Sequence, residues 1–213
     1  MHTFSFIAGQ IQKGKSVTRS FLNYRLRSEV LSGKTIDIGG GTGAGYIKFM
    51  DSAANLDFTT FDPRNGDEVN FETDALPAAD NTYDTVIFLN VMEHIFNYQH
   101  VMNEVVRITK KDGQVIGFVP FLMWYHPDHS DYFRYTHEAL EKIITAAGVT
   151  HFEIEPVQKG LFIAAFHMKC LALPRLLRVP FFSLAYAADT LVSVVKKNNP
   201  PKYVLGYFFK IVK

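Results

Sequence analysis

The sequence predicts a doubly wound α/β fold, in which a mostly parallel sheet of seven strands lies between layers of helices. Short apolar segments rich in β-branched and aromatic residues alternate with segments of helical periodicity. These apolar segments are continuous rather than alternating, which is typical of strands buried on both faces. The first of them ends in a run of glycines, a pattern that favours a ligand-binding loop at the carboxyl edge of such a sheet.

The chain order of the elements follows from the same patterns. The expected strands are Thr35–Ile38, Phe58–Phe61, the short third segment Val69–Phe71, Thr85–Leu89, Val115–Val119, Phe152–Val157 and Tyr203–Val212. Helices are expected over Lys15–Leu31, Tyr46–Ala54, Asn97–Ile108 and His137–Ala147. Asn97 and Thr136 are suited to cap the last two helices, and Gly148 to end the last one. We expect the final strand to be antiparallel, at or near an edge, with Gly206 at a bulge.

Length and composition indicate one globular domain. The chain has 213 residues, of which 47% are hydrophobic and 20% charged. Its single cysteine, Cys170, excludes an internal disulfide and favours a reducing, cytoplasmic location. Residues 1–9 show no signal peptide pattern. We expect a helical extension (1–33), a ligand-binding core (34–157), a helical insertion (158–202) and a last strand (203–213).

Candidate ligand-binding residues follow the ends of the expected strands. Asp37 comes before the glycines Gly39, Gly41 and Gly43, whose lack of side chains lets backbone N–H groups approach a ligand. Asp62 ends the next strand, where its carboxylate can accept hydrogen bonds from both hydroxyls of a ribose. On its own, the glycine run also fits a dinucleotide-binding loop.

Several stretches in a fixed order resemble the class I S-adenosylmethionine-dependent methyltransferases, in particular the small-molecule branch called type 11. They are IDIGGGTG, FTTFD, TDALP, YDTVIFLNVMEHI, RITKKDGQVI and the helix after YFRYT, and they span Thr35 to Gly148. The resemblance implies that S-adenosylmethionine is the cofactor. It also implies residue roles: the three glycines pass under the methionine part, Asp37 is oriented toward its ammonium group, Asp62 holds the ribose, Asp74 and Ala75 meet the adenine, and Asn90 lines the sulfonium end.

Other interpretations of these residues remain open. Asp37 and Asp74 can instead cap turns. Asp62 would serve an NAD(P)-dependent oxidoreductase equally well, although Asp74-Ala75 and Glu93-His94 have no evident part in hydride transfer. A third possibility is a non-catalytic membrane- or partner-binding module on a methyltransferase fold.

Proton-accepting residues gather after the expected fourth and fifth strands. The catalytic candidates are His94, His126, His129 and Asp131, because methyl transfer needs alignment and removal of a proton from the acceptor. The loop Met123–Tyr135 that holds most of them is dense in aromatic residues, and we expect it to form a wall of the acceptor site. Arg134 in this loop can bind an anionic group or pair with Asp128 or Asp131.

The pair Glu93-His94 raises the question of a metal. Some metal-dependent methyltransferases carry a glutamate three residues before such a pair, and this chain has Asn90 there. His126 and His129 could complete a site with Glu93 and His94. We expect no metal, with the pair capping a helix or orienting a loop.

The C-terminal part is basic and apolar. Residues 1–155 hold 13 Lys/Arg and 20 Asp/Glu (net −7), whereas residues 156–213 hold nine basic residues and Asp189 alone (net +8). No uninterrupted apolar stretch here reaches the ~20 residues of a membrane-spanning helix. The insertion 158–202 is therefore expected to be a helical pair at an anionic membrane surface, a lid or a homodimer contact. We expect a small-molecule or glycan-type acceptor, methylated on oxygen, and no nucleic acid.

Overall fold

A six-stranded sheet forms the centre of the structure, a computed structural model that describes residues 3–41, 45–62, 69–127, 130–195 and 202–213. Its strands are β2 (Lys34–Ile38), β4 (Asp57–Phe61), β5 (Tyr83–Leu89), β6 (Thr109–Pro120), β7 (His151–Val157) and β8 (Gly206–Val212). The strand order is β4-β2-β5-β6-β8-β7. The first four strands in this order are parallel, and β8 runs antiparallel between β6 and β7. The doubly wound, mostly parallel α/β fold is thus confirmed.

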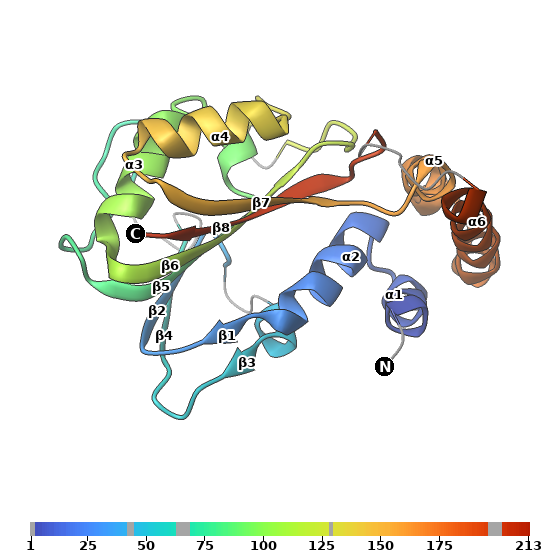
Figure 1. The fold of residues 1–213 in the computed structure, drawn as a ribbon, viewed down its shortest axis with the longest axis horizontal. Helices are drawn as coiled ribbons and strands as arrows, with labels where there is room; N and C mark the ends of the chain where they lie inside the picture. Colours follow the sequence, from blue (N-terminus) through green and yellow to red (C-terminus); the bar gives the residue numbers. More distant parts are fainter. Residues whose placement is uncertain (1–2, 42–44, 63–68, 128–129, 196–201) are drawn as a thin grey trace.

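Helices cover both faces of this sheet (Figure 1). They are α1 (Thr3–Gln12), α2 (Val17–Arg25), α3 (Tyr98–Ile108), α4 (His137–Ala146), α5 (Leu161–Lys169) and α6 (Arg175–Val195), with single 3-10 turns at η1 (Leu26–Ser28), η2 (Ile47–Phe49), η4 (Met92–His94) and η5 (Cys170–Ala172). Helices α3 and α4 lie on one face, and α1 and α2 on the other. Helices α5 and α6 stand beside α1 at one end of the sheet.

The central strand β5 connects two hydrophobic cores. Val86 and Phe88 point into the core under α3 and α4, whereas Ile87 and Leu89 point into the core under α1, α2 and α5. Successive side chains of a strand face opposite sides, so a strand covered on both sides must be apolar throughout. The continuous apolar segments of the sequence have this origin.

The strand count differs from the expected seven, since the sheet among the described residues has six strands. The segment Val69–Phe71 is not a strand. Its backbone enters a turn instead, in which the N–H groups of Thr73 and Asp74 donate to the carbonyl of Asn70.

Two expected helices are wrong in extent for a shared reason. Lys15–Leu31 holds only α2 and η1 before a short strand, β1 (Val30–Leu31), and Tyr46–Ala54 holds one 3-10 turn before β3 (Asp51–Ser52). Strands β1 and β3 pair in parallel, and the N–H groups of Asp51 and Ala53 donate to carbonyls of the β1 segment. This long-range pairing overrides local helical periodicity.

Most other boundaries agree with the sequence to within a few residues, but β6 begins at Thr109, six residues before the expected start at Val115. The Thr136 hydroxyl accepts from Ala139 N at the start of α4, whereas Asn97 precedes α3 without a side-chain cap bond. Strand β8 lies next to an edge, as expected. Gly206 is not at a bulge, because it pairs in continuous register with Pro120 and Val157.

The insertion forms the helical pair α5–α6. Asp189 of α6 is 3% exposed, and its carboxylate accepts from the backbone N–H groups of Phe162 (3.0 Å) and Ile163 (2.8 Å) in the first turn of α5. Helix α1 packs against the pair, with the ring of Phe4 stacked on Phe182. Asp189 therefore acts as the N-terminal cap of a neighbouring helix and ties the two together.

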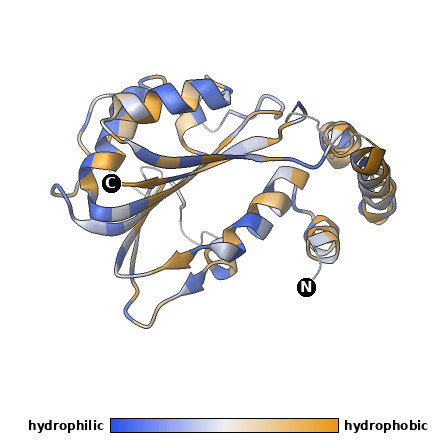
Figure 2. Ribbon diagram, in the orientation of Figure 1, coloured by the Kyte–Doolittle hydropathy of each residue, from blue (hydrophilic) through white to orange (hydrophobic). Residues whose placement is uncertain are grey.

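Helix α6 is long and apolar enough, by length and composition alone, to cross a membrane. Arg175 and Arg178 interrupt its apolar sequence, but the helix is continuous over 21 residues. Hydrophobic residues recur around both α5 and α6 (Figure 2). Much of this apolar surface is exposed, including Leu176 at 90% and Leu191 at 70%.

Replacing Asp189 with alanine should lower the free energy of unfolding by about 1–3 kcal/mol, because two buried N–H groups lose their acceptor. Urea unfolding followed by circular dichroism measures the change. The control is Thr190→Ala, which removes only an exposed hydroxyl bonded within α6 and should cost less than about 0.5 kcal/mol. Equal effects of the two substitutions would contradict the capping role.

Candidate functional site

The glycine turn follows β2 at the carboxyl edge of the sheet. Gly39 and Gly41 have φ angles of 76° and 65°, which side chains rarely permit. A Cβ on Gly39 would also overlap the side chain of Val91, which follows β5. The turn therefore lies against the end of β5 and presents bare backbone. Gly43 lies outside the described residues.

Asp37 is fully buried at the end of β2. The hydroxyl of Tyr46 donates to its two carboxylate oxygens, at 2.8 and 2.7 Å. Burial raises the pKa of Asp37 to about 6, with Asp62 adding to the rise, while the Tyr46 hydrogen bond and the charge of Arg19 oppose it. A Cβ on Gly40 would overlap both Asp37 and Tyr46, so these two side chains pack directly against the glycine turn.

Tyr46 and Arg19 belong to the site, although sequence reasoning did not single them out. Arg19 extends from α2, and its guanidinium lies 5.4 Å from the centre of the Tyr46 ring. Burial lowers the pKa of Arg19, and the neighbouring charges of Glu93 and Asp37 oppose this shift. The N-terminal extension thus brings a positive charge to two buried carboxylates. No local motif marks this, because the contact depends on how α2 packs.

Asp62 lies one strand away, where β4 ends. It is 2% exposed, and the neighbouring Phe61 carbonyl accepts from Gly39 N at 2.7 Å, so Asp62 and the glycine turn meet at one edge. Asp74 and Ala75 are exposed in the turn that replaces the third segment. The carboxylate of Asp74 accepts from Asn70 N and the Thr73 hydroxyl, bonds that cap this turn and lower the pKa of Asp74.

Asn90 follows β5 with a φ angle of 56°. Its N–H donates to Phe118 O, which fixes the backbone. Its side-chain oxygen is buried without a hydrogen-bond partner within the described part of the chain. A buried polar atom of this kind ordinarily has a partner, so its position suits a bound ligand.

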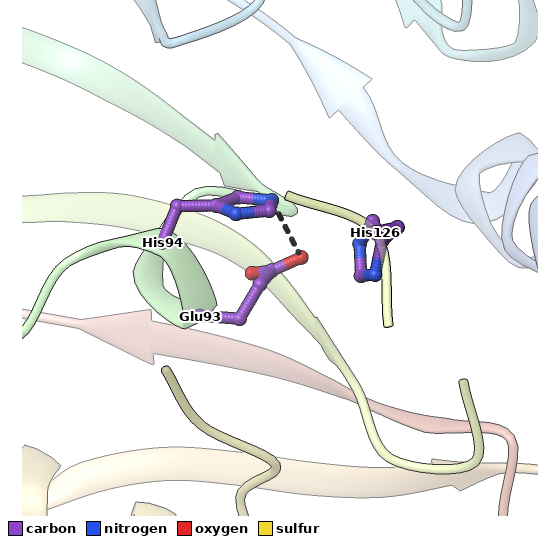
Figure 3. A group of neighbouring side chains, drawn as sticks. All are labelled: Glu93, His94 and His126. Carbon is purple, nitrogen blue, oxygen red and sulfur yellow. Dashed lines mark ion pairs between the residues drawn. The ribbon is translucent and has the colours of Figure 1, made fainter. Parts of the chain in front are cut away.

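Glu93, His94 and His126 form a cluster just beyond Asn90 (Figure 3). Glu93 and His94 come from η4, and His126 from the loop after β6. One ligating atom of each lies within 4.8 Å of the others. Glu93 is fully buried, and burial raises its pKa to about 8; its own backbone N–H and the charges of Arg134 and Arg19 oppose this rise, and the charge of Asp131 adds to it.

Asp131 and Arg134 hold the loop rather than facing outward. Arg134 pairs with both carboxylate oxygens of Asp131, at 2.5 and 2.8 Å, and Asp131 also accepts from His126 N at 2.9 Å. These bonds lower the pKa of Asp131 to about 2, with the Arg134 bond the main cause. Of the two options for Arg134, pairing within the loop is the one observed. His129 and Asp128 lie outside the described residues.

A family model described as a methyltransferase domain matches residues 11–150. The chain belongs to this methyltransferase family. The match spans the glycine turn, Asp62 and the Glu93–His94–His126 cluster. The chain is an S-adenosylmethionine-dependent methyltransferase, as the sequence resemblance implied, and the nicotinamide alternative is set aside.

Solved structures share the fold of this methyltransferase at low identity. A phosphoethanolamine N-methyltransferase 2 of Haemonchus contortus, in complex with S-adenosylhomocysteine, is 16% identical with a TM-score of 0.55 over 92% of this chain and 52% of its own. The complex of the Haloferax volcanii Trm112 methyltransferase activator with a methyltransferase matches at 13% identity and a TM-score of 0.55 over 99% and 97%. The [4+2]-cyclase SpnF is 14% identical, with a TM-score of 0.51, over 92% of this chain and 80% of the cyclase chain.

A curated relative adds local similarity only. An uncharacterized protein of Methanocaldococcus jannaschii is 49% identical over 44 residues, which are 21% of this chain and 19% of that protein. The cyclase shows that this fold also serves other reactions. The acceptor must therefore be argued from the site of this chain.

The site of this methyltransferase fits S-adenosylmethionine in two respects. The turn at Gly39 and Gly40 packs so closely on Val91, Asp37 and Tyr46 that neither position has room for a Cβ, which leaves this turn at the carboxyl edge of the sheet without side chains. The side-chain oxygen of Asn90, which is buried without a partner among the described residues, lies directly after β5. The next residue, Val91, packs against this turn. The buried, negatively charged groups around it suit a cofactor that carries an ammonium and a sulfonium charge.

Replacing Asp37 with asparagine should remove a pH-dependent loss of stability. The folded-state pKa of about 6 exceeds the ordinary 3.8, so ionisation costs the native state about 3 kcal/mol once the pH exceeds 6, and none of this cost remains well below pH 4. The difference in unfolding free energy, Asp37→Asn minus wild type, should rise by roughly 1–2 kcal/mol from pH 5 to pH 7.5. Asp57→Asn, at the exposed start of β4, is the control; a flat difference for Asp37→Asn would refute the buried charge.

Proposed function

We propose that this methyltransferase transfers the methyl group of S-adenosylmethionine to an oxygen atom of a small-molecule or glycan-type acceptor. One observation carries the proposal: the Glu93–His94–His126 cluster of proton-accepting groups lies directly beyond the strand end that contacts the glycine turn. Hydroxyl acceptors must lose a proton as the methyl group is transferred, and imidazole is suited to accept one near neutral pH.

The residues at the strand ends each contact a different part of the cofactor. Gly39 and Gly41 pass under the methionine part, together with Gly43. Asp62 accepts from the ribose hydroxyls, and Asn90 lines the sulfonium end. Asp74 and Ala75 meet the adenine edge, which is compatible with the exposed position of both.

Asp37 acts on the methionine end through its charge. Its oxygens are occupied by Tyr46, so it attracts the ammonium group at a distance while holding the turn in place. Arg19 supplies the opposite charge on the same side, which suits the methionine carboxylate.

The reaction needs alignment more than activation of the donor. Bound S-adenosylmethionine supplies the methyl group; the acceptor oxygen forms the new C–O bond as the C–S bond breaks, and the electron pair of that bond stays on sulfur. The acceptor proton passes to the cluster, for which His94 and His126 are the candidates, with His129 nearby in sequence. Asp131 is a positioning residue, because it fixes the backbone of His126 and the side chain of Arg134.

The exposed apolar face of α5–α6 is the surface for a lipid-proximal acceptor. The insertion is basic, and its one acid, Asp189, is buried. Exposed leucines beside Lys and Arg suit an anionic bilayer surface, and a groove of about 490 Å³ between the two helices is lined mostly by apolar side chains. The methyltransferase fold itself is consistent with the cytoplasmic location expected from the sequence.

Replacing Asp62 with alanine should weaken S-adenosylhomocysteine binding by about 10- to 100-fold, because the ribose loses a charged acceptor. Isothermal titration calorimetry measures the affinity. Asp57→Ala is the matched control at the opposite end of β4 and should bind like the wild type. Unchanged affinity in Asp62→Ala would contradict the assigned ribose contact.

Vesicles of anionic phosphatidylglycerol should pellet the wild-type protein at low salt, whereas phosphatidylcholine vesicles should not. Leu184→Glu combined with Leu191→Glu should abolish pelleting, because both exposed side chains lie on one face of α6. Val30→Glu, an exposed apolar site on β1, is the control. A salt-insensitive dimer in sedimentation equilibrium without lipid binding would contradict the membrane proposal and favour a homodimer contact.

A further inference from the structure

The Glu93–His94–His126 cluster has the composition and spacing of a metal site. Oε1 of Glu93 lies 3.7 Å from Nε2 of His94, and the ligating atoms of all three residues lie within 4.8 Å of one another. The side chains converge on one point from η4 and from the loop after β6 (Figure 3). Two histidines and one carboxylate are a common ligand set of zinc sites that keep an open position.

Glu93 lacks the partners that a buried carboxylate needs. It is 0% exposed, and neither of its oxygens accepts a hydrogen bond from another residue among those that the structure describes. Arg134 pairs with Asp131, and Arg19 lies against the Tyr46 ring, so each cation already has a neighbour of its own. A bound cation would satisfy the two oxygens of Glu93, which otherwise remain buried without a partner from another residue.

Both imidazoles are oriented as metal ligands are. Nδ1 of His94 lies 2.5 Å from Ser130 O, and Nδ1 of His126 lies 3.0 Å from Trp124 O. A carbonyl only accepts, so each Nδ1 carries the proton and each Nε2 keeps its lone pair. Histidine ligands typically donate their other N–H to a backbone carbonyl in this way, which fixes the ring and the tautomer.

The surroundings of His126 support this tautomer. Nη2 of Arg134 also lies 3.4 Å from Nδ1 of His126. Its two protons are directed to Trp124 O (3.0 Å) and to Asp131 (2.8 Å), so it has none left for the imidazole. Asp131 Oδ2 lies 3.5 Å from the same Nδ1 and adds a second acceptor.

We propose that Glu93, His94 and His126 bind a divalent transition-metal ion of the zinc type, with an open position for an oxygen of the methyl acceptor. The ligand set itself stands on the cluster geometry, and only the occupant of the open position rests on the proposed function. With the ion bound, His94 and His126 act as metal ligands in place of the proton-accepting role proposed for them in the metal-free cluster. The acceptor proton then passes to solvent, because a nearby divalent cation lowers the pKa of a hydroxyl.

The first test is metal binding by chelator-treated, tag-free protein. Titration with ZnCl₂ should show one site per chain, and CoCl₂ should give the visible absorption of a low-coordinate Co²⁺ site. Glu93→Gln and His126→Gln should each weaken Zn²⁺ binding at least tenfold, while His151→Gln, an exposed histidine on β7, should bind like the wild type. No stoichiometric binding, or unchanged binding in both cluster variants, would overturn the proposal.

Folding and cofactor binding are measured separately on the same variants. Zn²⁺ should raise the melting temperature of the wild type but not that of Glu93→Gln, which should itself be at least as stable as the metal-free wild type because its neutral amide avoids the cost of burying a carboxylate. S-adenosylhomocysteine binding without zinc binding overturns the metal site alone. Zinc binding without methyl transfer to any hydroxyl acceptor would overturn the proposed function alone.

Discussion

The burial of β2 and β5 on both faces is the constraint on which the structure depends. Ile87 and Leu89 fill one core and Val86 and Phe88 fill the other, and the polar side chains within these strands (Thr35, Asp37 and Thr85) are fully buried as well. The chain can place chemistry only where the strands end. Asp37, Asp62 and Asn90 stand at three such ends, and the Gly39–Val91 contact brings two of these ends together.

The acidic side chains gathered at this edge of the sheet outnumber the positively charged ones. Asp37 and Glu93 are both fully buried, and both have a raised pKa because burial disfavours their ionised forms. The positive charge of Arg19 opposes both shifts, but it is itself half-buried and its own pKa is lowered. Buried acids in this position suit incoming positive charge, which supports the proposed ammonium group of the cofactor near Asp37 and the proposed metal ion at Glu93.

Sequence patterns predicted the strands of the sheet more accurately than the segments around it. The apolar runs located β2, β4 and β5 to within two residues, and for the central strand β5 the reason is that burial on both faces requires a continuous apolar sequence. The helix expected over Tyr46–Ala54 failed because β3 pairs with β1, a contact between segments about 20 residues apart in sequence. Arg19, Tyr46 and the convergence of Glu93 with His126 depend on tertiary packing, which a local pattern does not encode.

The insertion is joined through α5 to the loop that carries His126. His167 is fully buried, its Nε2 lies 2.9 Å from Leu122 O, and its ring lies 5.1 Å from that of Trp124. The carbonyl of Trp124 in turn holds Nδ1 of His126 and accepts from Arg134. Because Asp189 ties α6 to α5, the exposed apolar face of α6, His167 and the His126 loop form one continuous series of contacts. The proposed membrane contact at α6 is therefore linked through packed side chains to the loop that carries His126.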